Sequence, residues 1–461
     1  MLNYSVAELR LIMKKTLLAM VAMMATGGAA MAQNGITEIA DPEALGLEGT
    51  CMSPNGKYIA GSCYNTGDGF IYDRETKEMK VFPATVETEN DDPDLQMKGV
   101  ANTGVAVGWD NDTATKFDFT TGKATKTGES GQYLFYGISP SGKLTLGARF
   151  DDTDNCPQGT PCYFKDGEPV ELPLPSNKFI GYNIDGGTAL QATDDSLICG
   201  FMVDDMATRP AIMWSPNRDN KTFSTYPISR PYFDGAMDSS KPYASFSCDQ
   251  ATMSPNGKYL IITLEKYVGE WESYYGIARY NTETDSVEVF LATEEDEEMP
   301  EVAYGIYGFA ISNDGTMVGC AGDMEACNGF IWKKGDERPH NLSSVYTGAT
   351  RLLAYEGTNK PCAISADGRY ITGFAYVLAD GADPDDEYAE YNYLSYILDT
   401  QDPGAVAPSA VKNATTSKTA DGSKVKGYYS LSGKRLDVMN KLNGITIVKT
   451  ADGKGHKVLV K

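Results

Sequence analysis

Short apolar runs alternate with tight polar turns between about residue 50 and residue 400. In the recurring pattern an apolar residue precedes Ser-Pro-Asn-Gly or a variant of it, and an apolar-rich run follows. Pro presets φ at the second turn position, Asn or Asp tolerates the third, and Gly takes the left-handed conformation that closes the turn. Each copy therefore predicts a strand, a tight turn and a second strand. Seven copies occur, at 52–61, 101–108, 138–147, 192–200, 253–262, 311–319 and 364–373.

A second apolar run follows each copy and predicts a third strand. These runs lie at 69–73, 115–119, 161–164, 211–214, 276–280, 329–332 and 396–399. In most copies a polar turn and a further short β-type run come next. Four strands per unit, repeated at steps of 39 to 62 residues, are typical of a propeller blade. The predicted fold class is all-β, a seven-bladed β-propeller over residues 33–400. The alternative is a pair of β-sandwiches.

The seventh copy lacks a fourth strand of its own, because it runs into the Pro- and Ala-rich segment 402–408. We predict that residues 36–39, Ile-Thr-Glu-Ile, supply this strand. Pairing of the N-terminus with the last blade closes the ring and removes exposed sheet edges.

The first 32 residues have the three parts of a secretory signal peptide: Lys14 and Lys15, an apolar run at 17–24, and Ala-Met-Ala at 30–32. Residues 1–12 precede what looks like a complete signal start, and we interpret them as lying upstream of the true start. The apolar run is shorter than the roughly 20 residues of a bilayer span. We therefore predict an exported protein, periplasmic, on the cell surface or secreted, without a transmembrane span in the mature chain.

Charge divides the chain unevenly. The formal net charge is −23, but residues 33–411 hold 26 Lys or Arg against 59 Asp or Glu. Residues 412–461 hold 11 Lys or Arg against 3 Asp or Glu. A strongly negative body repels phosphate backbones and anionic lipids, which argues against nucleic-acid partners. Cations and basic partners are compatible with it.

The composition changes to Pro, Ala, Ser, Thr and Lys at 401–426, which predicts a linker. Residues 427–461 follow as a small basic β-domain, with short strands expected near 428–435, 443–449 and 457–461.

Asn-Asp-Gly-Thr-Met-Val-Gly at 313–319, followed by Gly-Phe-Ile-Trp at 329–332, resembles the HAF-type extracellular repeat. The Ser-Pro-Asn-Gly-Lys-Tyr copies are similar to WD40-like or TolB-type propeller repeats. The tail resembles the C-terminal β-domains of Bacteroidetes exported proteins, which implies a type IX secretion sorting domain. The tail lacks the upstream strands of that pattern, so an accessory β-module without a sorting role is the alternative. The propeller resemblance implies architecture and no particular activity.

Nine cysteines leave at least one without an internal partner in an exported protein. The locally plausible pairs are Cys156 with Cys162 and Cys320 with Cys327. With only His340 and His456 and no Cys-x-x-Cys, a Cys/His zinc site has too few ligands. Structural or free thiols are favoured.

Enzyme signatures are sparse in this sequence, and no catalytic residues are assigned. Two histidines and no Gly-x-Ser-x-Gly motif argue against a serine hydrolase. Asp383, Asp385 and Glu387 alternate in an acidic run and are the candidate Ca²⁺ ligands, although the run is not an EF-hand loop. No other cofactor is predicted.

Aromatic residues in polar segments are the candidate ligand contacts: Trp271, Tyr274, Tyr275, Tyr388, Tyr391 and Tyr393. They favour a non-enzymatic propeller that binds a glycan, a peptide or a partner protein at the cell envelope. The alternatives are a glycan-active hydrolase or lyase with acidic catalytic residues, and a structural envelope component.

Overall fold

The structure is a computed structural model. It describes residues 35–41, 43–85, 93–150, 159–174, 184–204, 211–216, 223–226, 242–245, 253–267, 273–284, 286–291, 299, 302, 305–322, 327–347, 359–378, 391–405, 425–429, 435–436, 444–450 and 455–460. The chain divides into two units, residues 1–406 and 407–461. The predicted signal peptide lies outside the described residues.

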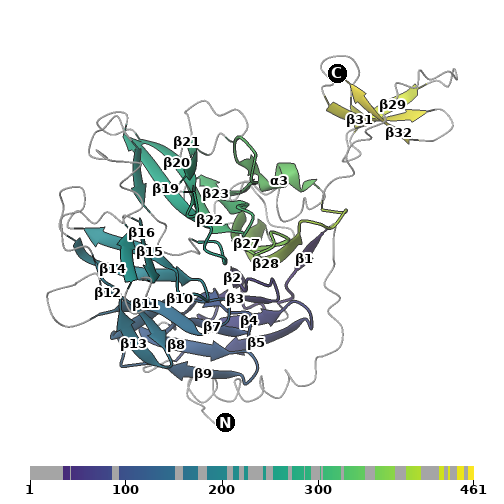
Figure 1. Cartoon of the computed structure of the whole chain (residues 1–461). Coiled ribbons are helices and arrows are strands. Elements are labelled where there is room, and N and C mark those ends of the chain that lie inside the picture. Colours follow the sequence, from purple (N-terminus) through teal and green to yellow (C-terminus); the bar gives the residue numbers. More distant parts are fainter. Residues whose placement is uncertain are drawn as a thin grey trace, which may run out of the picture. The chain divides into compact units, whose positions relative to one another are not determined.

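The first unit is a seven-bladed β-propeller, and each blade is a four-stranded antiparallel sheet (Figure 1). Blades 1 and 2 consist of β2 (Leu47–Met52), β3 (Tyr58–Cys63), β4 (Gly69–Asp73) and β5 (Glu78–Phe82), then β6 (Leu95–Val100), β7 (Val105–Asp110), β8 (Thr113–Asp118) and β9 (Lys123–Lys126). Blades 3 and 4 consist of β10 (Tyr133–Ile138), β11 (Leu144–Arg149), β12 (Thr160–Lys165) and β13 (Glu168–Glu171), then β14 (Ile184–Ala192), β15 (Ile198–Asp204), β16 (Ala211–Pro216) and β17 (Phe223–Tyr226).

Blades 5 and 6 consist of β18 (Pro242–Ser245), β19 (Tyr259–Tyr267), β20 (Ser273–Asn281) and β21 (Ser286–Leu291), then β22 (Ile306–Ile311), β23 (Met317–Gly322), β24 (Cys327–Trp332) and β25 (His340–Asn341). A short helix, α3 (Leu342–Val345), follows β25. Blade 7 consists of β26 (Asn359–Ile364), β27 (Tyr370–Leu378), β28 (Tyr391–Asp399) and β1 (Ile36–Glu38). The predicted all-β, seven-bladed fold class is confirmed. Each of the seven runs predicted as a third strand forms a strand of its blade.

The ring closes through the N-terminus, as the sequence predicts. Ile36 pairs with Leu398 and Glu38 with Tyr396, in an antiparallel register. Ile36 and Ile39 are buried, and Ile39 packs against the first blade. Strand β1 therefore completes the last blade and also contributes to its interface with the first.

The repeated turns have the conformation that their sequence predicts. Gly56 has a φ of +70°, and the equivalent glycines of blades 2, 3, 5, 6 and 7 also have positive φ. In the degenerate fourth copy Ser196 takes this position with a φ of +73°. Within the first turn, Ser53 Oγ accepts the N–H of Tyr58 at 2.8 Å and donates to Asn55 Oδ1 at 2.7 Å. The shape of the turn that recurs in the repeats thus depends on a side-chain hydroxyl as well as on glycine.

Neighbouring turns are joined by two kinds of hydrogen bond. In the first kind, the N–H of the third turn residue donates to a side-chain oxygen of the next blade: Asn55 to Asn102 at 2.8 Å, Ser141 to Asp194 at 2.9 Å, and Asn256 to Asn313 at 2.9 Å. The donating turn in each case has Pro at its second position, and Pro has no N–H. The third residue is therefore the donor.

The second kind of junction occurs where the second turn residue is not Pro. Its own N–H donates to the carbonyl oxygen of the second residue in the next turn: Asn102 to Pro140, Asn313 to Ala366, and Ala366 to Pro54. The last bond, at 2.7 Å, joins blade 7 to blade 1. Recorded bonds of the two kinds span six of the seven junctions.

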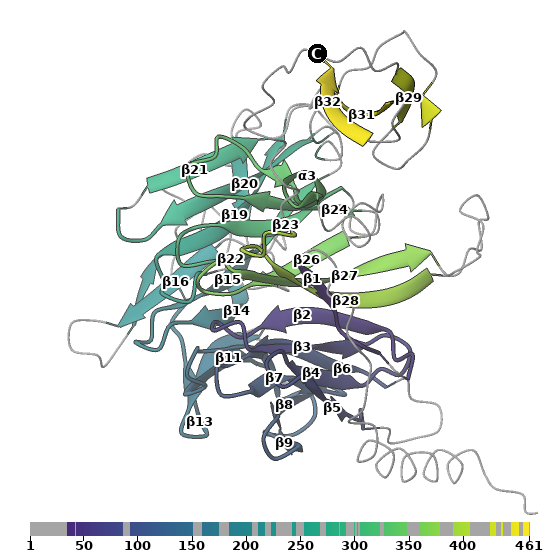
Figure 2. The ribbon, with the colours of Figure 1, turned by 90° about the vertical axis from the view of Figure 1, so that its right-hand side faces the viewer.

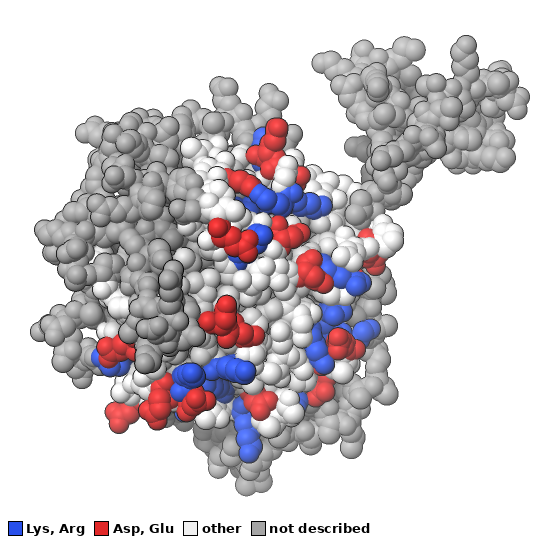
Figure 3. Space-filling model, viewed as in Figure 1, with Lys and Arg blue, Asp and Glu red and all other residues white. Residues whose placement is uncertain are grey.

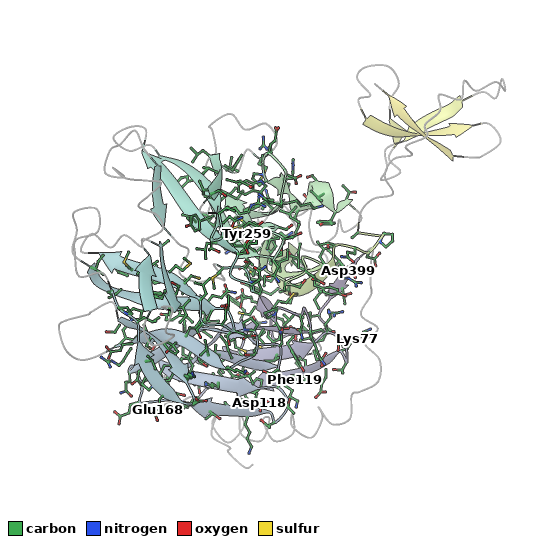
Figure 4. All side chains as sticks on the ribbon, in the orientation of Figure 1. Lys77, Asp118, Phe119, Glu168, Tyr259 and Asp399 are labelled. Carbon is green, nitrogen blue, oxygen red and sulfur yellow. The ribbon has the colours of Figure 1, made fainter. Side chains whose placement is uncertain are left out.

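The hydrophobic core is divided into clusters between adjacent blades. Tyr259, labelled in Figure 4, lies in one such cluster with side chains of blades 5 and 6, including Met317 and Trp332. Glycine at the middle of the second strand lets strands approach closely: a Cβ on Gly61 would lie 1.8 Å from the carbonyl oxygen of Glu48. This crowding explains why Gly recurs at the end of most repeat copies.

Six inner strands carry a β-bulge at the same repeat position, three residues before the first turn residue. The bulged residues are Thr50, Lys98, Tyr136, Leu190, Phe309 and Cys362. The equivalent residue of blade 5 lies outside the described residues. Bulges bend a strand and redirect its side chains, so this shared feature orients one residue per blade in the same way.

The second unit contains β29 (Val425–Tyr429), β30 (Arg435–Leu436), β31 (Gly444–Thr450) and β32 (Gly455–Val460), with strand order β30-β29-β31-β32. Its role in sorting stays a prediction. In the described part of the whole chain, no helix is long and apolar enough to span a membrane.

Candidate functional site

The two ends of the ring differ in chemistry. We call the end that carries the seven repeat turns the turn end, and the opposite end the aromatic end. At the turn end, acidic and basic side chains lie among one another (Figure 3). Ion pairs there join Lys57 to Asp73 at 3.5 Å and Arg369 to Asp399 at 2.8 Å. Each of these four charged groups thus has a partner within the chain.

At the aromatic end, blades 7 and 1 bring together five aromatic side chains, which we call the aromatic patch: Tyr64, Phe374, Tyr376, Tyr391 and Tyr393. Tyr376 and Tyr393 are directly opposite each other on β27 and β28, and their rings lie 4.7 Å apart, edge to face. Tyr64, just after β3, stacks on Tyr393 with ring centroids 4.1 Å apart and planes 17° apart. Strands β27 and β28 project at the right of the ring in Figure 2.

The patch presents large aromatic surfaces to solvent. Tyr64 is 60% exposed and Tyr391 is 45% exposed, whereas Phe374 is 7% exposed. Tyr391 and Tyr393 are two residues apart on β28, so both side chains lie on the same face of that strand. Exposed large apolar side chains are informative when they are contiguous, because isolated ones are ordinary at a protein surface. In the aromatic patch the exposed rings of Tyr64 and Tyr391 occur together with the buried ring of Phe374.

The segment between β1 and β2 holds Tyr64 in place through the backbone. The N–H of Tyr64 donates to the carbonyl oxygen of Gly46 at 2.8 Å, and the next N–H, of Asn65, donates to Leu45 at 3.0 Å. Asp41 Oδ1 and Oδ2 accept the N–H groups of Leu45 and Gly46, each at 2.8 Å. The segment that carries Tyr64 is therefore fixed by several hydrogen bonds before any ligand arrives.

Carboxyl groups lie within electrostatic reach of the patch. Burial raises the pKa of the Glu48 carboxyl, and the Lys360 ammonium partly offsets this effect. Burial raises the pKa of Tyr376 to about 12, and the charge of Glu48 adds to the shift. The pKa of Tyr393 is raised by burial, by its hydrogen bond with Tyr64 and by nearby groups that include Glu48. The phenols therefore stay protonated at neutral pH and can donate hydrogen bonds.

A second aromatic group, between blades 2 and 3, is already occupied by the chain's own side chains. Trp109 lies edge to face with Tyr136 at 5.4 Å, and Lys98 Nζ lies 4.8 Å from the Trp109 ring centroid. Trp109 Nε1 donates to Asp94 Oδ2 at 3.3 Å. The indole N–H of Trp109 and one face of its ring therefore already have partners within the chain.

The residues predicted as ligand contacts separate in the structure. Tyr391 and Tyr393 lie in the aromatic patch. Tyr275 lies on β20 and packs against the core cluster between blades 5 and 6. Tyr274 also belongs to β20, opposite Lys266 in the strand register. Trp271 and Tyr388 lie outside the described residues.

Sequence reasoning did not select Tyr64, Tyr376 or Glu48. A signal was available, because Tyr64 and Tyr376 stand at the same repeat position, three residues after Gly61 and Gly373. Blades 7 and 1 are neighbours only because the ring closes, so these equivalent tyrosines come together across the closure.

No metal centre is found in the part of the chain that the structure describes, where no three His, Cys, Asp or Glu side chains gather closely enough to hold an ion. The candidate Ca²⁺ ligands Asp383, Asp385 and Glu387 lie outside that part, and calcium binding stays a prediction.

Each of the seven described cysteines carries a thiol rather than a disulfide, and six of them are buried. Cys320 and Cys327 lie on adjacent strands, and a hydrogen bond between the two thiols raises the pKa of Cys320. Burial raises the pKa of Cys51 to about 11 and that of Cys162 to about 12. Cys156, the predicted partner of Cys162, lies outside the described residues. Thiols with such pKa values are poor nucleophiles, which argues for a packing role.

The strand pairing defines the class of protein as a seven-bladed β-propeller. No family model matches the sequence, and no curated protein matches it. Among solved structures, hydrazine synthase of Kuenenia stuttgartiensis is 13% identical, with 76% of this chain and 95% of that chain covered and a TM-score of 0.42. A streptogramin B lyase is 13% identical, with 80% and 99% covered and a TM-score of 0.41. TolB from Acinetobacter baumannii is 15% identical, with 62% and 64% covered and a TM-score of 0.37.

Proposed function

We propose that this chain is an exported binding protein of the cell envelope that holds its ligand at the aromatic end, over blades 7 and 1. One observation carries the proposal: Tyr64, 60% exposed, is held in a stack on Tyr393 beside the exposed Tyr391. Rigid aromatic side chains give large contact areas at a small entropic cost, and they are enriched in binding surfaces. Export is supported by the signal-like sequence of residues 1–32.

The proposal is tested by binding of the whole chain to arrays of glycans and of peptides, with release of products measured in the same wells. We expect saturable binding without products, and a loss of at least tenfold in affinity in Tyr64→Ala and Tyr391→Ala. Val170→Ala is the matched control, because Val170 is 38% exposed on the outer strand β13.

Two other outcomes favour the alternative functions. Released oligosaccharides would favour a glycan-active enzyme, whose candidate acid is Glu48 because its pKa is raised. Binding that is equal in both tyrosine variants and the control would contradict the proposed site, and no binding to either array would favour a structural role.

A further inference from the structure

The aromatic rings of this propeller are commonly covered by its own cations. The guanidinium of Arg74 lies 3.9 Å from the ring centroid of Tyr370, and that of Arg279 lies 4.4 Å from that of Trp332. Lys98 covers Trp109 in the same way. Such cation–π contacts are stabilising because the face of an aromatic ring carries negative potential.

The tyrosines of the aromatic patch form an exception. Among the described residues, no Lys or Arg lies over the rings of Tyr64, Tyr376, Tyr391 or Tyr393. The nearest recorded contact is that of Lys360 Nζ, 5.9 Å from the ring centroid of Phe374. Since one face of Tyr64 stacks on Tyr393 and its side chain is 60% exposed, the other face of Tyr64 is open to solvent.

Carboxyl groups act on the residues next to this open ring. Glu48 acts on the phenols of Tyr376 and Tyr393, and Asp41 and Asp68 act on Cys63, the residue directly before Tyr64. Among the described residues, Lys360 is the cation that acts on Glu48. The charge of the whole body has the same sign, with 59 Asp or Glu against 26 Lys or Arg between residues 33 and 411. Such a field attracts cations and speeds their encounter with the surface.

We propose that the aromatic patch binds a basic segment of a partner protein and takes an Arg or Lys side chain onto the open face of Tyr64. The inference rests on the proposed function and specifies its ligand. Glu48 supplies the counter-charge, and the protonated phenol of Tyr376 is a donor for a carbonyl group of the bound segment. A neutral glycan would use the stacking surface but would gain nothing from the negative charge of the carboxyl groups.

The test uses the whole chain and two fluorescent nonapeptides of equal length, one rich in Arg and one with citrulline in place of each Arg. Binding is followed by anisotropy, with a neutral oligosaccharide set measured in parallel. We expect the Arg peptide to bind at least tenfold more tightly than the citrulline peptide. We also expect its affinity to fall as salt rises from about 50 to 300 mM, because added ions screen the attraction.

Four variants separate the cation–π contact from general attraction. Tyr64→Leu keeps an apolar side chain but loses the π-face, and we expect a loss of about 5- to 30-fold, whereas Tyr64→Phe should retain binding. Glu48→Gln should weaken binding of the Arg peptide, and Val170→Ala should not. Thermal melting of each variant checks that the fold is kept.

The outcomes distinguish the two proposals. Tyr64-dependent binding of a neutral oligosaccharide, without binding of the Arg peptide, would overturn the inference and leave the proposed function standing. Equal binding of the Arg peptide to Tyr64→Leu, Glu48→Gln and the parent chain would show attraction by the acidic body alone, and would also overturn the inference. If no ligand depends on Tyr64, both proposals fail.

Discussion

Ile36, in the first strand of the described chain, pairs with Leu398 in the last blade, and both side chains are buried in one cluster. The two ends of the propeller sequence are thus held together by side-chain packing as well as by backbone pairing of β1 with β28. Removal of this packing should open the ring and expose the edge of β28.

The first prediction concerns this closure. Ile36→Ala and Ile39→Ala should each lower the free energy of unfolding by about 2–4 kcal/mol, since each removes a buried aliphatic side chain. Deletion of residues 33–40 should lower the melting temperature by more than either substitution. Thermal and urea unfolding measure these effects, with Glu38→Ala as the control for a change within the same strand. An unchanged melting temperature after the deletion would contradict the role of β1.

The second prediction concerns the hydrogen bonds between turns. Asn102→Ala removes the acceptor of the Asn55 N–H and should cost about 1 kcal/mol, whereas Asn102→Asp keeps an acceptor and should cost less. Thr103→Ala, in the same turn and exposed, is the matched control. If urea unfolding gives equal stabilities for Asn102→Ala and Thr103→Ala, this hydrogen bond contributes nothing measurable.

The third prediction concerns acid. Burial tends to raise the pKa of Asp314, but hydrogen bonds from Ser312 and Thr316 outweigh it, and the pKa falls below the ordinary value of 3.8. Because the folded pKa is depressed, the stabilisation is complete above the unfolded pKa and is lost as pH falls through the folded pKa. Asp399, paired with Arg369, has the same direction of shift.

Stability measured by urea unfolding should therefore decline below about pH 4. Asp314→Asn cannot titrate at this position, so its stability should depend less steeply on pH over the same range. Asp118→Asn serves for comparison, because Asp118 Oδ1 also accepts backbone N–H groups, those of Thr120 and Thr121. An identical pH dependence in Asp314→Asn and the parent chain would rule out a contribution from this carboxyl group.

The fourth prediction concerns thiol reactivity. Burial raises the pKa of Cys51 from 9.0 to about 11, which lowers the thiolate fraction near pH 8 by about 100-fold. Iodoacetamide should therefore label Cys51 at least 100-fold more slowly in the native chain than in urea, as measured by peptide mass spectrometry. Rapid native labelling of Cys51 would contradict its raised pKa.

The architecture could be predicted from local chemistry, while the candidate site could be predicted only in part, through Tyr391 and Tyr393. Residues such as Pro54, Asn55 and Gly56 specify a turn by their own conformational preferences, and the repeat of this turn sets the number of blades. The closing strand at Ile36 could be predicted because the seventh copy lacks a fourth strand. The turn and the number of blades depend on neighbours in sequence, and the closing strand depends on the count of strands per copy.

The aromatic patch depends on contacts between residues far apart in sequence. Tyr275 and Tyr391 look alike in sequence, yet the first packs in a core and the second is 45% exposed. What separates them is the position of each strand end relative to the ring, which hydrophobic pattern does not encode. The repeat alignment of Tyr64 with Tyr376 was the one available clue, and its meaning depends on closure of the ring.

The two kinds of junction between turns have a consequence for the parity of the ring. The second turn residue alternates between Pro and Asn or Asp through six blades: Pro54, Asn102, Pro140, Asp194, Pro255 and Asn313. An alternation of period two cannot return in phase around seven blades. A proline at position 366 would have no N–H to donate to Pro54. Pro54 in turn has no side-chain oxygen that could accept the N–H of the third turn residue, Asp367. Ala366 keeps its N–H and donates it to Pro54, so the odd number of blades places two junctions of the second kind in succession, from Asn313 to Ala366 and from Ala366 to Pro54.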